Sequence, residues 1–487
     1  MQAIETLLNA IDRMNLQVDK NLVMEAYDLA VQAHQGQKRL SGEDYIVHPL
    51  WTAVNLAEMK MDEDSIIAGL LHDVLEDTPV TLKEIEKKFG KEIAFLVDGV
   101  SKLKKVQYYG SPNYIENLRK MFVAMAKDIR VIIIKLCDRL HNLQTLEFKH
   151  PEEQQRIAKE TLEIYSPIAN RLRLGQLKGK MEDWAFRFLF PEDFRWLNNL
   201  SMKMYYQREA NLLQTKLEIQ KFLQQEKIEI ISIHDRSKFL YSLYNKMKAH
   251  DMDISKIYDL IALRIILPSV SDCYAALGVI HRQYKPLKGR IKDYIAQPKP
   301  NGYQSLHTTV FAANGDIVEV QIRTKDMHES AEYGIAAHWN YKEGDKVNQV
   351  QKLTWVKELA QLIKKLEDSR EFESLKIDFF KKRIFVFTPR GDVIDLPEHS
   401  TSVDFAYHIH TEVGNHCVKA KINDKIASLD TRLQNGDVVE IILDKKRAGP
   451  SLNWVKFCQT AMAKAKIREY HRQKTEKWEK GLSRNGS

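Results

Sequence analysis

The chain has 487 residues, too many for one hydrophobic core, so its length predicts about three domains. A composition that is 44% hydrophobic and 29% charged is ordinary for a globular protein and excludes a wholly disordered one. No apolar run reaches the ~18 residues of a membrane span, and the charged, helical start of the chain is unlike a signal peptide. We therefore expect a soluble cytoplasmic protein without a membrane partner.

The cysteines and the distribution of charge narrow the class further. Four cysteines lie far apart without a C-x-x-C pair, which excludes a zinc ribbon and a disulfide framework. The net charge of +8 comes from the end of the chain, where residues 445–487 hold twelve Lys and Arg against three Asp and Glu. This segment predicts either a solvated amphipathic helix or a contact with RNA.

Three sequence patterns follow one another along the chain. Up to about residue 200, apolar residues recur every three or four positions, which predicts an all-helical domain. From about residue 229, β-rich runs such as Ile257–Leu267 and Ile317–Ile322 alternate with helical stretches, as in an α/β domain. A charged helical connector follows at 342–378. From Arg383 to a strand at Val438–Leu443, strands, turns and one helix predict a small β-grasp-like module.

The first candidate site is a cluster of acids and histidines in the helical part. His72 and Asp73 are followed by Glu76 and Asp77, and the i,i+4 spacing predicts that all four lie on one side of a single helix. Such a cluster repels itself unless a cation neutralises it. The pattern therefore favours a metal site, in which Glu76 and Asp77 would align or deprotonate a metal-bound water.

Two further segments can complete this metal site. One holds a histidine before a proline at an expected helix start, and the other places Asp138, Asn142 and Thr145 on one helix face. The expected ligands are His48, His72, Asp73 and Asp138. A set of two imidazoles and two carboxylates suits Mn, Fe or Zn better than Mg or Ca. The alternative is a helical bundle with hydrogen-bonded structural histidines.

The second candidate site combines two acids with many cations. Asp259 and Glu319 lie in separate predicted strands, and carboxylates on neighbouring strands can hold Mg²⁺ with a nucleoside triphosphate. Between them, a basic stretch suited to polyphosphate ends in Tyr303, whose ring can stack on a base. No G-x-x-x-x-G-K-[ST] sequence is present, which excludes a P-loop enzyme. An ordinary half-exposed sheet is the alternative.

These motifs resemble those of long RelA/SpoT homologues over about residues 20–470. Three segments are similar to the hydrolase domain of that family, which is a branch of the HD phosphohydrolases: 37–49, 72–78 and 138–142. The basic Arg290-x-Lys292-Asp293 is similar to the version in bifunctional members. Residues 383–443 resemble the TGS domain of the family. The resemblance implies a multidomain fold with an all-α HD-type domain, an α+β nucleotidyltransferase-like synthetase domain and a small β-grasp TGS domain.

The resemblance also assigns roles to individual residues. It implies Mn²⁺ at the four ligands named above, with Glu76 and Asp77 as catalytic residues. It implies Mg²⁺ at Asp259 and Glu319, with Glu319 also activating the substrate hydroxyl. The substrate-binding residues that it implies are Arg39, Asn142, Thr145, Arg236, Lys238, Lys246, Arg264, Lys292, Lys299, Asn301, Tyr303, His307, Gln321 and Arg323.

The implied function is that of a bifunctional alarmone enzyme. It would act as a GTP pyrophosphokinase, moving pyrophosphate from ATP to the 3′-hydroxyl of GDP or GTP, and as a guanosine-3′,5′-bis(diphosphate) 3′-diphosphatase. Two alternatives stay open: a hydrolase whose synthetase domain only binds nucleotide, and a stress module that binds tRNA or the ribosome. Because both reactions together would waste ATP, we expect nucleotide at one site to disfavour the competent form of the other.

The expected domains are 1–200 (hydrolase), 201–341 (synthetase), 342–382 (helical linker), 383–443 (TGS) and 444–487 (a basic segment that begins a truncated helical region). In the family, TGS domains contact uncharged tRNA on ribosomes, which makes tRNA and the ribosome expected partners; intramolecular contacts alone are the competing interpretation. We expect residues 482–487 to be a fusion remnant and ribosome-dependent regulation to be weakened or lost.

Overall fold

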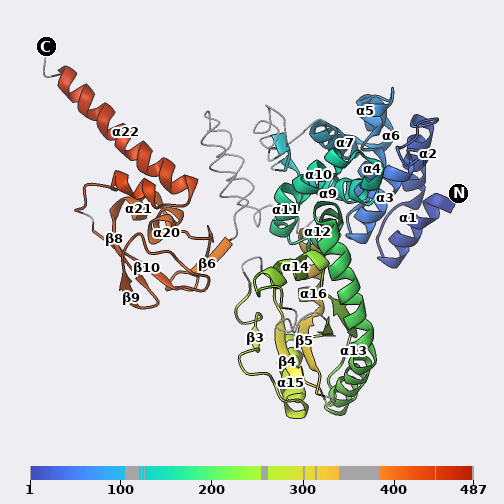
Figure 1. Ribbon diagram of the computed structural model, residues 1–487. Coiled ribbons are helices and arrows are strands. Elements are labelled where there is room, and N and C mark those ends of the chain that lie inside the picture. The colour runs from blue at the N-terminus through green and yellow to red at the C-terminus, as the bar shows by residue number, and fades with distance from the viewer. Residues whose placement is uncertain are drawn as a thin grey trace. The chain divides into compact units, whose positions relative to one another are not determined.

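The computed structural model describes residues 2–104, 120–121, 123–125, 127–253, 261–299, 302–312, 315–338, 383–444 and 446–484. They belong to two compact units, Met1–Ala360 and Gln361–Ser487 (Figure 1). None of the helices in these ranges combines the length and the apolar character that a membrane span requires. The predicted connector at 342–382 lies outside the described residues.

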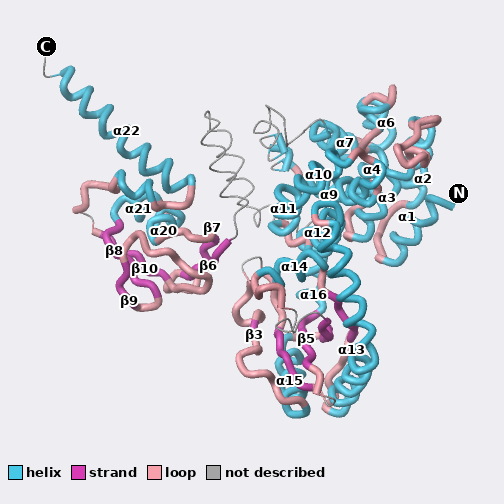
Figure 2. The backbone as a smooth tube through the Cα atoms, in the orientation of Figure 1, coloured by secondary structure: helices cyan, strands magenta, loops and turns pink. Residues whose placement is uncertain are grey.

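The described residues of the first part of the larger unit form helices joined by loops (Figure 2), as the sequence predicts. Its helices are α1 (Gln2–Arg13), α2 (Lys20–Ala33), α3 (Val47–Glu58), α4 (Glu63–Leu71), α5 (Val74–Asp77), α6 (Leu82–Phe89), α7 (Lys91–Lys104), α9 (Ile129–Gln144), α10 (Pro151–Glu160), α11 (Ser166–Arg171) and α12 (Gly175–Leu189). A π-helical turn at Thr161–Tyr165 joins α10 to α11. Helix α9 packs against α3, α4, α7 and α12, so even its polar residues Lys135, Asp138 and His141 are buried.

One local prediction in this region is wrong. His72 and Asp73 do not lie within a single helix with Glu76 and Asp77, because α4 ends at Leu71 and α5 begins at Val74. The reason is a side-chain bond: the His72 ring Nδ1 lies 2.7 Å from the Gly69 carbonyl oxygen. In an unbroken helix that oxygen would accept from the backbone N–H four residues later.

A five-stranded sheet forms the second part of the larger unit. Its elements are α13 (Pro191–Gln225), β1 (Ser232–Ser237), α14 (Leu240–Lys248), β2 (Ile261–Leu267), α15 (Val270–Gln283), β3 (Lys292–Asp293), β4 (Leu306–Phe311), β5 (Ile317–Thr324) and α16 (Lys325–Tyr333). The strand order is β1-β2-β5-β4-β3, with β2 and β5 parallel and the other neighbours antiparallel. Apolar residues of α13, α14 and α15 pack on one face of this sheet, so the polar residues of the other face are available for a site.

The smaller unit has a two-stranded and a three-stranded sheet around two short helices. Its elements are β6 (Arg383–Phe387), β7 (Val393–Pro397), α20 (Ser402–Ile409), α21 (Thr411–His416), β8 (Cys417–Ile422), β9 (Lys425–Ala427), β10 (Val439–Leu443) and α22 (Ala461–Arg484). A parallel bridge between Phe387 and Val438 connects the β6–β7 pair to the segment that leads into β10. The second helix, α21, and the strand β9 were not predicted.

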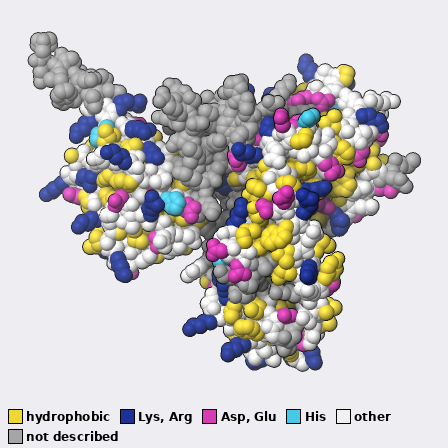
Figure 3. Space-filling view, in the orientation of Figure 1, with side chains coloured by type: hydrophobic (Ala, Val, Ile, Leu, Met, Phe, Trp, Pro, Cys, Tyr) yellow, Lys and Arg dark blue, Asp and Glu magenta, His cyan; other side chains and the backbone are white. Residues whose placement is uncertain are grey.

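The basic end of the chain begins as part of this unit's core. Trp454, Cys458 and Ile467 pack with Val403 of α20, and buried Asp404 accepts hydrogen bonds from the backbone N–H groups of residues 459 and 460. Lys and Arg side chains are spread over the visible face of the unit (Figure 3). The start of the basic segment is therefore packed on the module and not a fully solvated helix.

Candidate metal centre and nucleotide site

The four predicted metal ligands come together in the core of the helical region. His48 is the second residue of α3, His72 and Asp73 lie between α4 and α5, and Asp138 lies in α9; all four side chains are at most 5% exposed. The donor atoms of His48, His72 and Asp138 lie within 4.8 Å of one another. Asp73 Oδ1 lies 3.3 Å from His72 Nε2, and Asp73 Oδ2 lies 3.6 Å from His48 Nε2.

The bonding of His72 fits a metal ion at this place. Its Nδ1 donates to the Gly69 carbonyl oxygen, which leaves Nε2 as the ring nitrogen that could bind a metal ion. That Nε2 is buried and has no hydrogen-bond partner among the described residues. Because an unpaired buried nitrogen beside two carboxylates is costly, a cation that accepts its lone pair would satisfy all three groups. The group therefore constitutes a candidate divalent metal site.

His48 is oriented by a histidine that the sequence analysis did not assign. His48 Nδ1 lies 2.8 Å from Nδ1 of His141, one turn of α9 beyond Asp138. Burial, together with His48 and Arg39, lowers the pKa of His141 to about 2, so His141 is neutral. Its Nδ1 can then accept from His48 Nδ1–H, which leaves His48 Nε2 facing Asp138 at 3.1 Å. His141 stands in the Asp138–Asn142 motif, but only the fold shows what it contacts.

Arg39, which the sequence analysis predicted to bind substrate, lies beside His141 of this centre. Its guanidinium donates to Asn142 Oδ1 and Thr145 Oγ1, both at 3.1 Å, and lies 3.1 Å from His141 Nδ1. Burial lowers the pKa of Arg39, although Tyr45 and the site carboxylates oppose this. Three of the predicted substrate-binding residues are therefore joined in one hydrogen-bonded group next to the metal ligands.

The remaining charges of the centre are also paired. Lys135 Nζ lies 2.6 Å from Asp138 Oδ2. Burial favours the neutral form of Asp138, but Lys135 and the two histidines outweigh it and hold the pKa of Asp138 well below its ordinary value. The Tyr45 hydroxyl lies 2.9 Å from an oxygen of Asp73 and from one of Asp77. Lys135 and Tyr45 were not predicted to take part.

Of the two predicted catalytic acids, Asp77 is linked to Asp73 through the Tyr45 hydroxyl, which donates to both carboxylates. Glu76 accepts a hydrogen bond of 2.8 Å from Ser101 on α7. The difference follows from the short helix α5, which turns the two neighbouring side chains to different sides.

In the sheet region, a row of polar side chains crosses all five strands. Strand register pairs His234 of β1 with Arg264 of β2, Arg264 with Gln321 of β5, Gln321 with His307 of β4, and His307 with Lys292 of β3. Paired residues share a face of the sheet. Four of these five residues were predicted to bind substrate. The sequence analysis assigned no role to the fifth, His234.

Glu319 is held next to this row by its neighbours on β4 and β5. Its Oε1 lies 3.0 Å from His307 Nδ1 and accepts a 3.0 Å bond from Gln321 Nε2. His307 Nε2 lies 2.9 Å from the Tyr303 hydroxyl, and Arg236 donates to Gln321 at 3.5 Å. Burial lowers the pKa of His307, so a neutral imidazole bridges the predicted base-stacking tyrosine and the predicted catalytic acid.

Cations around Tyr303 make this face suited to an anion. The Lys299 ammonium lies 5.0 Å and the Arg323 guanidinium 5.6 Å from the centre of its ring. Arg323 is fully buried, yet none of its three side-chain nitrogens has a hydrogen-bond partner among the described residues. A buried guanidinium in this state is a strong candidate for binding phosphate.

The other predicted residues of this site are accounted for as follows. Lys246 lies on α14 and Lys238 in the turn before it, and both are partly buried. Asp259 and Asn301 lie outside the described residues.

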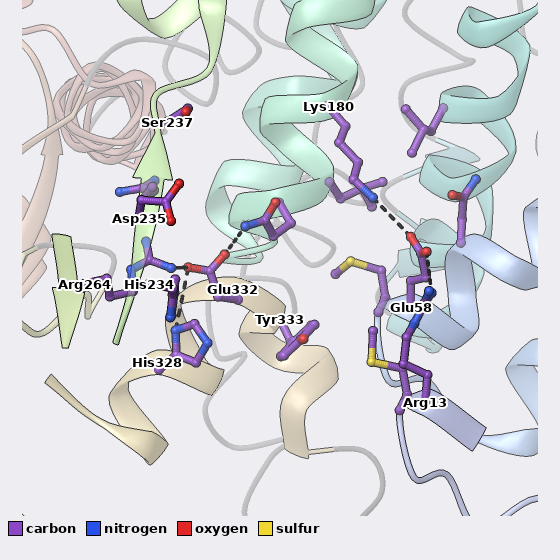
Figure 4. Close-up of a pocket in the computed structure, with 17 residues that line it drawn as sticks. Arg13, Glu58, Lys180, His234, Asp235, Ser237, Arg264, His328, Glu332 and Tyr333 are labelled. Atoms are coloured by element: carbon purple, nitrogen blue, oxygen red, sulfur yellow. Dashed lines mark hydrogen bonds and ion pairs between the residues drawn. The ribbon is translucent and has the colours of Figure 1, made fainter. Parts of the chain in front are cut away.

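A pocket of about 530 Å³ lies between the helical and the sheet regions of the larger unit (Figure 4). Arg264, His234, His328 and Glu332 line one side, and Lys180, Glu58 and Arg13 line the other, where both cations bind Glu58. Glu332 carries a negative charge at the edge of the candidate nucleotide site, whereas burial and the nearby arginines lower the pKa of His328 to about 4; no motif had singled out either residue. The pocket brings side chains of both regions together.

Three family models match successive parts of the chain. The model "HD domain" matches residues 26–175, "Region found in RelA / SpoT proteins" matches 235–346, and "TGS domain" matches 384–443. The fold class predicted from the sequence is thereby confirmed: the buried His/Asp group lies in an HD domain, and the polar sheet lies in a RelA/SpoT region.

Curated relatives match nearly the whole chain. The chain is 46% identical over 462 residues to a Myxococcus xanthus GTP pyrophosphokinase, covering 93% of the chain and 61% of the relative. It is 46% identical to a probable guanosine-3′,5′-bis(diphosphate) 3′-pyrophosphohydrolase from Synechocystis sp., covering 92% and 60%. With the Haemophilus influenzae guanosine-3′,5′-bis(diphosphate) 3′-pyrophosphohydrolase, identity is 43% and coverage 92% and 67%. The chain belongs to the RelA/SpoT family. It spans about 60% of the length of the first two relatives.

Proposed function

We propose that this chain is a bifunctional alarmone enzyme. One site transfers pyrophosphate from ATP to the 3′-hydroxyl of GDP or GTP, and the other hydrolyses (p)ppGpp to GDP or GTP and pyrophosphate. The observation that carries the proposal is the presence of two separate polar centres of opposite character. One is a buried group of His48, His72 and Asp138 that could hold a metal ion, and the other contains buried guanidinium nitrogens without hydrogen bonds among the described residues. Relatives named for each of the two activities support it.

For hydrolysis, the chain's own residues hold the substrate and the water. The site would take Mn²⁺, which, when bound, lowers the pKa of a water and neutralises phosphate charge. Arg39, Asn142 and Thr145 form the group placed to contact the nucleotide. Asp77, with Tyr45 against it, is placed to take a proton from water. Glu76, which accepts a hydrogen bond from Ser101 of α7, would help to align that water.

For synthesis, positioning and charge neutralisation are the main tasks. Asp259 and Glu319 would hold Mg²⁺, which would neutralise charge on the phosphates of ATP. Glu319, oriented by His307 and Gln321, accepts the proton of the 3′-hydroxyl. Tyr303 stacks on guanine, and the cations around it bind phosphates.

The wider assignments are part of the same proposal. We place the hydrolase, synthetase, linker, TGS and basic segments at 1–200, 201–341, 342–382, 383–443 and 444–487. Helix α13 runs unbroken through the proposed boundary at residue 200, so one continuous helix would connect the first two domains. Uncharged tRNA and the ribosome are the proposed macromolecular partners of the TGS domain, and the cytoplasm is the proposed location.

Two assays on the whole chain test the proposal. One supplies ATP and GDP with Mg²⁺, and the other supplies ppGpp with Mn²⁺. We expect ppGpp in the first, and GDP with pyrophosphate in the second. Hydrolysis alone would favour a hydrolase with a nucleotide-binding but inactive synthetase domain. No reaction in either assay, with tRNA or ribosome binding retained, would favour a binding module.

A further inference from the structure

A single buried carboxylate connects the two arginines of the nucleotide site to the helical region. Glu332 of α16 lies 2.6 Å from the Nη1 of Arg264 and 3.6 Å from the Nη2 of Arg323. Its other oxygen accepts a hydrogen bond from Gln176, the second residue of α12. Figure 4 shows the contact between Glu332 and Arg264 as a dashed line. Glu332 therefore contacts β2, β5 and α12 at once.

Glu332 lies between two buried positive charges, those of Arg264 and Arg323. Arg264 and Arg323 are almost fully buried, and burial followed by mutual repulsion lowers the pKa of Arg264 to about 10. Glu332 opposes that repulsion and is held ionised, because Arg264 and Arg323 outweigh the effect of burial and lower its pKa. Removing one partner from such a buried set leaves an uncompensated charge. The carboxylate thus fixes where both guanidinium groups lie.

The backbone segments at the start of α12 and at the end of α16 lie very close to each other beside this contact. A Cβ at Gly175 would lie 2.7 Å from the Ala331 carbonyl oxygen, and a Cβ at Gly334 would lie 2.3 Å from that of Leu172. The Ile335 N–H donates to the Leu172 carbonyl at 3.2 Å. Two glycines therefore allow the start of α12 and the end of α16 to meet, directly beside the Gln176–Glu332 bond.

We propose that Glu332 is a positioning residue of the nucleotide site: it holds Arg264 and Arg323 in place for the phosphates of ATP and is itself held by Gln176 of the helical region. This inference rests on the proposed synthetase function. It adds a residue that no motif assigned, and it makes the geometry of one site depend on a helix of the other region. Glu332 acts through the arginines and not on the substrate.

The first test replaces Glu332 with glutamine, which keeps the size and removes the charge. The affinity for a non-hydrolysable ATP analogue, measured by calorimetry on the whole chain, should fall about tenfold, equivalent to the loss of about one charged hydrogen bond. The KM for ATP should rise by a similar factor, with kcat changed less. Glu329→Gln is the matched control, because Glu329 lies on the same helix but binds Lys60 instead of the arginines. It should leave both values unchanged.

A double variant that exchanges the two side chains distinguishes positioning of the arginines from structural support alone. Combining Glu332→Gln with Gln176→Glu keeps one carboxylate and one amide between α12 and α16, but moves the charge away from Arg264. We expect the melting temperature to return toward that of the wild type while the ATP affinity stays weak. Recovery of both by the swap, or normal ATP affinity in Glu332→Gln, would overturn the inference.

The same measurements distinguish failure of the inference from failure of the proposed function. A wild-type chain that binds the ATP analogue but forms no ppGpp contradicts the synthetase proposal, and the binding data still decide the role of Glu332. A wild-type chain that binds no ATP analogue contradicts both.

Discussion

The two candidate sites are built in opposite ways. In the helical region, acids and imidazoles come from α3, α9 and the α4–α5 junction and are buried in the domain core. In the sheet region, the residues stand in one register row across five strands, and cations outnumber acids. Among the described residues, His72 Nε2 in the first site and the three Arg323 side-chain nitrogens in the second have no hydrogen-bond partner.

This difference indicates what each site is prepared to bind. A buried set of carboxylates and neutral imidazoles is stabilised by a metal cation. A set of buried guanidinium groups with one shared carboxylate is stabilised by polyphosphate. If this comparison is right, single substitutions should affect one reaction and spare the other.

The largest expected effect is in the helical site. Asp73→Ala should reduce ppGpp hydrolysis by at least about a thousandfold, because a carboxylate next to both imidazoles of the candidate metal site is lost. Synthesis of ppGpp by the same preparation should continue at the wild-type rate. That retained activity serves as the folding control, and parallel loss of both reactions would instead indicate a folding defect.

The converse substitution tests the sheet site. Glu319→Gln should lower synthesis by about a hundredfold or more, because the amide cannot take the proton of the 3′-hydroxyl. Hydrolysis should be unchanged. Asp259→Ala should have the same selective effect. A variant of Glu319 that synthesises ppGpp normally would remove the assignment of this residue as the base.

A smaller effect is expected at the residue that orients His48. His141→Ala removes the ring that accepts from His48 Nδ1, and loss of such a contact typically weakens metal binding by about 10- to 100-fold. The measurement is the Mn²⁺ affinity from calorimetry, with no nucleotide present. His150→Ala is the control, since His150 lies outside the site before α10. Equal Mn²⁺ affinities for the two variants would contradict this role of His141.

The sequence predicted the residues of the candidate metal centre because their chemistry is concentrated in motifs. His72-Asp73 and the Asp138–Asn142 segment carry unusual residue types at helical spacing, and the structure brings them together. The break between α4 and α5 was missed because it depends on the His72–Gly69 bond, which has no signal in residue spacing.

The contacts made by His141, Glu332 and His234 could not be predicted for a different reason. Each acts on a residue far away in the chain or on another strand, so only the packing of α9, α16 and β1 reveals its partner. The core beyond residue 443 was missed because a basic composition conceals the few apolar positions, such as Trp454 and Ile467, that pack on α20.

The smallest expected effect concerns the joint between the two regions. Asp183 of α12 accepts hydrogen bonds from the backbone N–H groups of Leu240 and Tyr241 at the start of α14, the helix that carries Lys246. Burial raises the pKa of Asp183 to about 6, although these two bonds oppose the shift. The protonated form therefore suits the fold better than the carboxylate.

It follows that the contribution of Asp183 to stability is fully present below its ordinary pKa near 3.8 and is lost as the pH rises through about 6. Asp183→Asn is uncharged at every pH. One of the two backbone N–H groups then faces the amide nitrogen, which lowers stability by an amount that does not depend on pH. Relative to the wild type, the variant should gain on the order of 2 kcal/mol in unfolding free energy between pH 4 and pH 7. Urea unfolding of the whole chain across that range measures this difference. Parallel curves for the two proteins would mean that the fold accepts the Asp183 carboxylate without penalty, and that the joint between the helical and sheet regions is insensitive to pH.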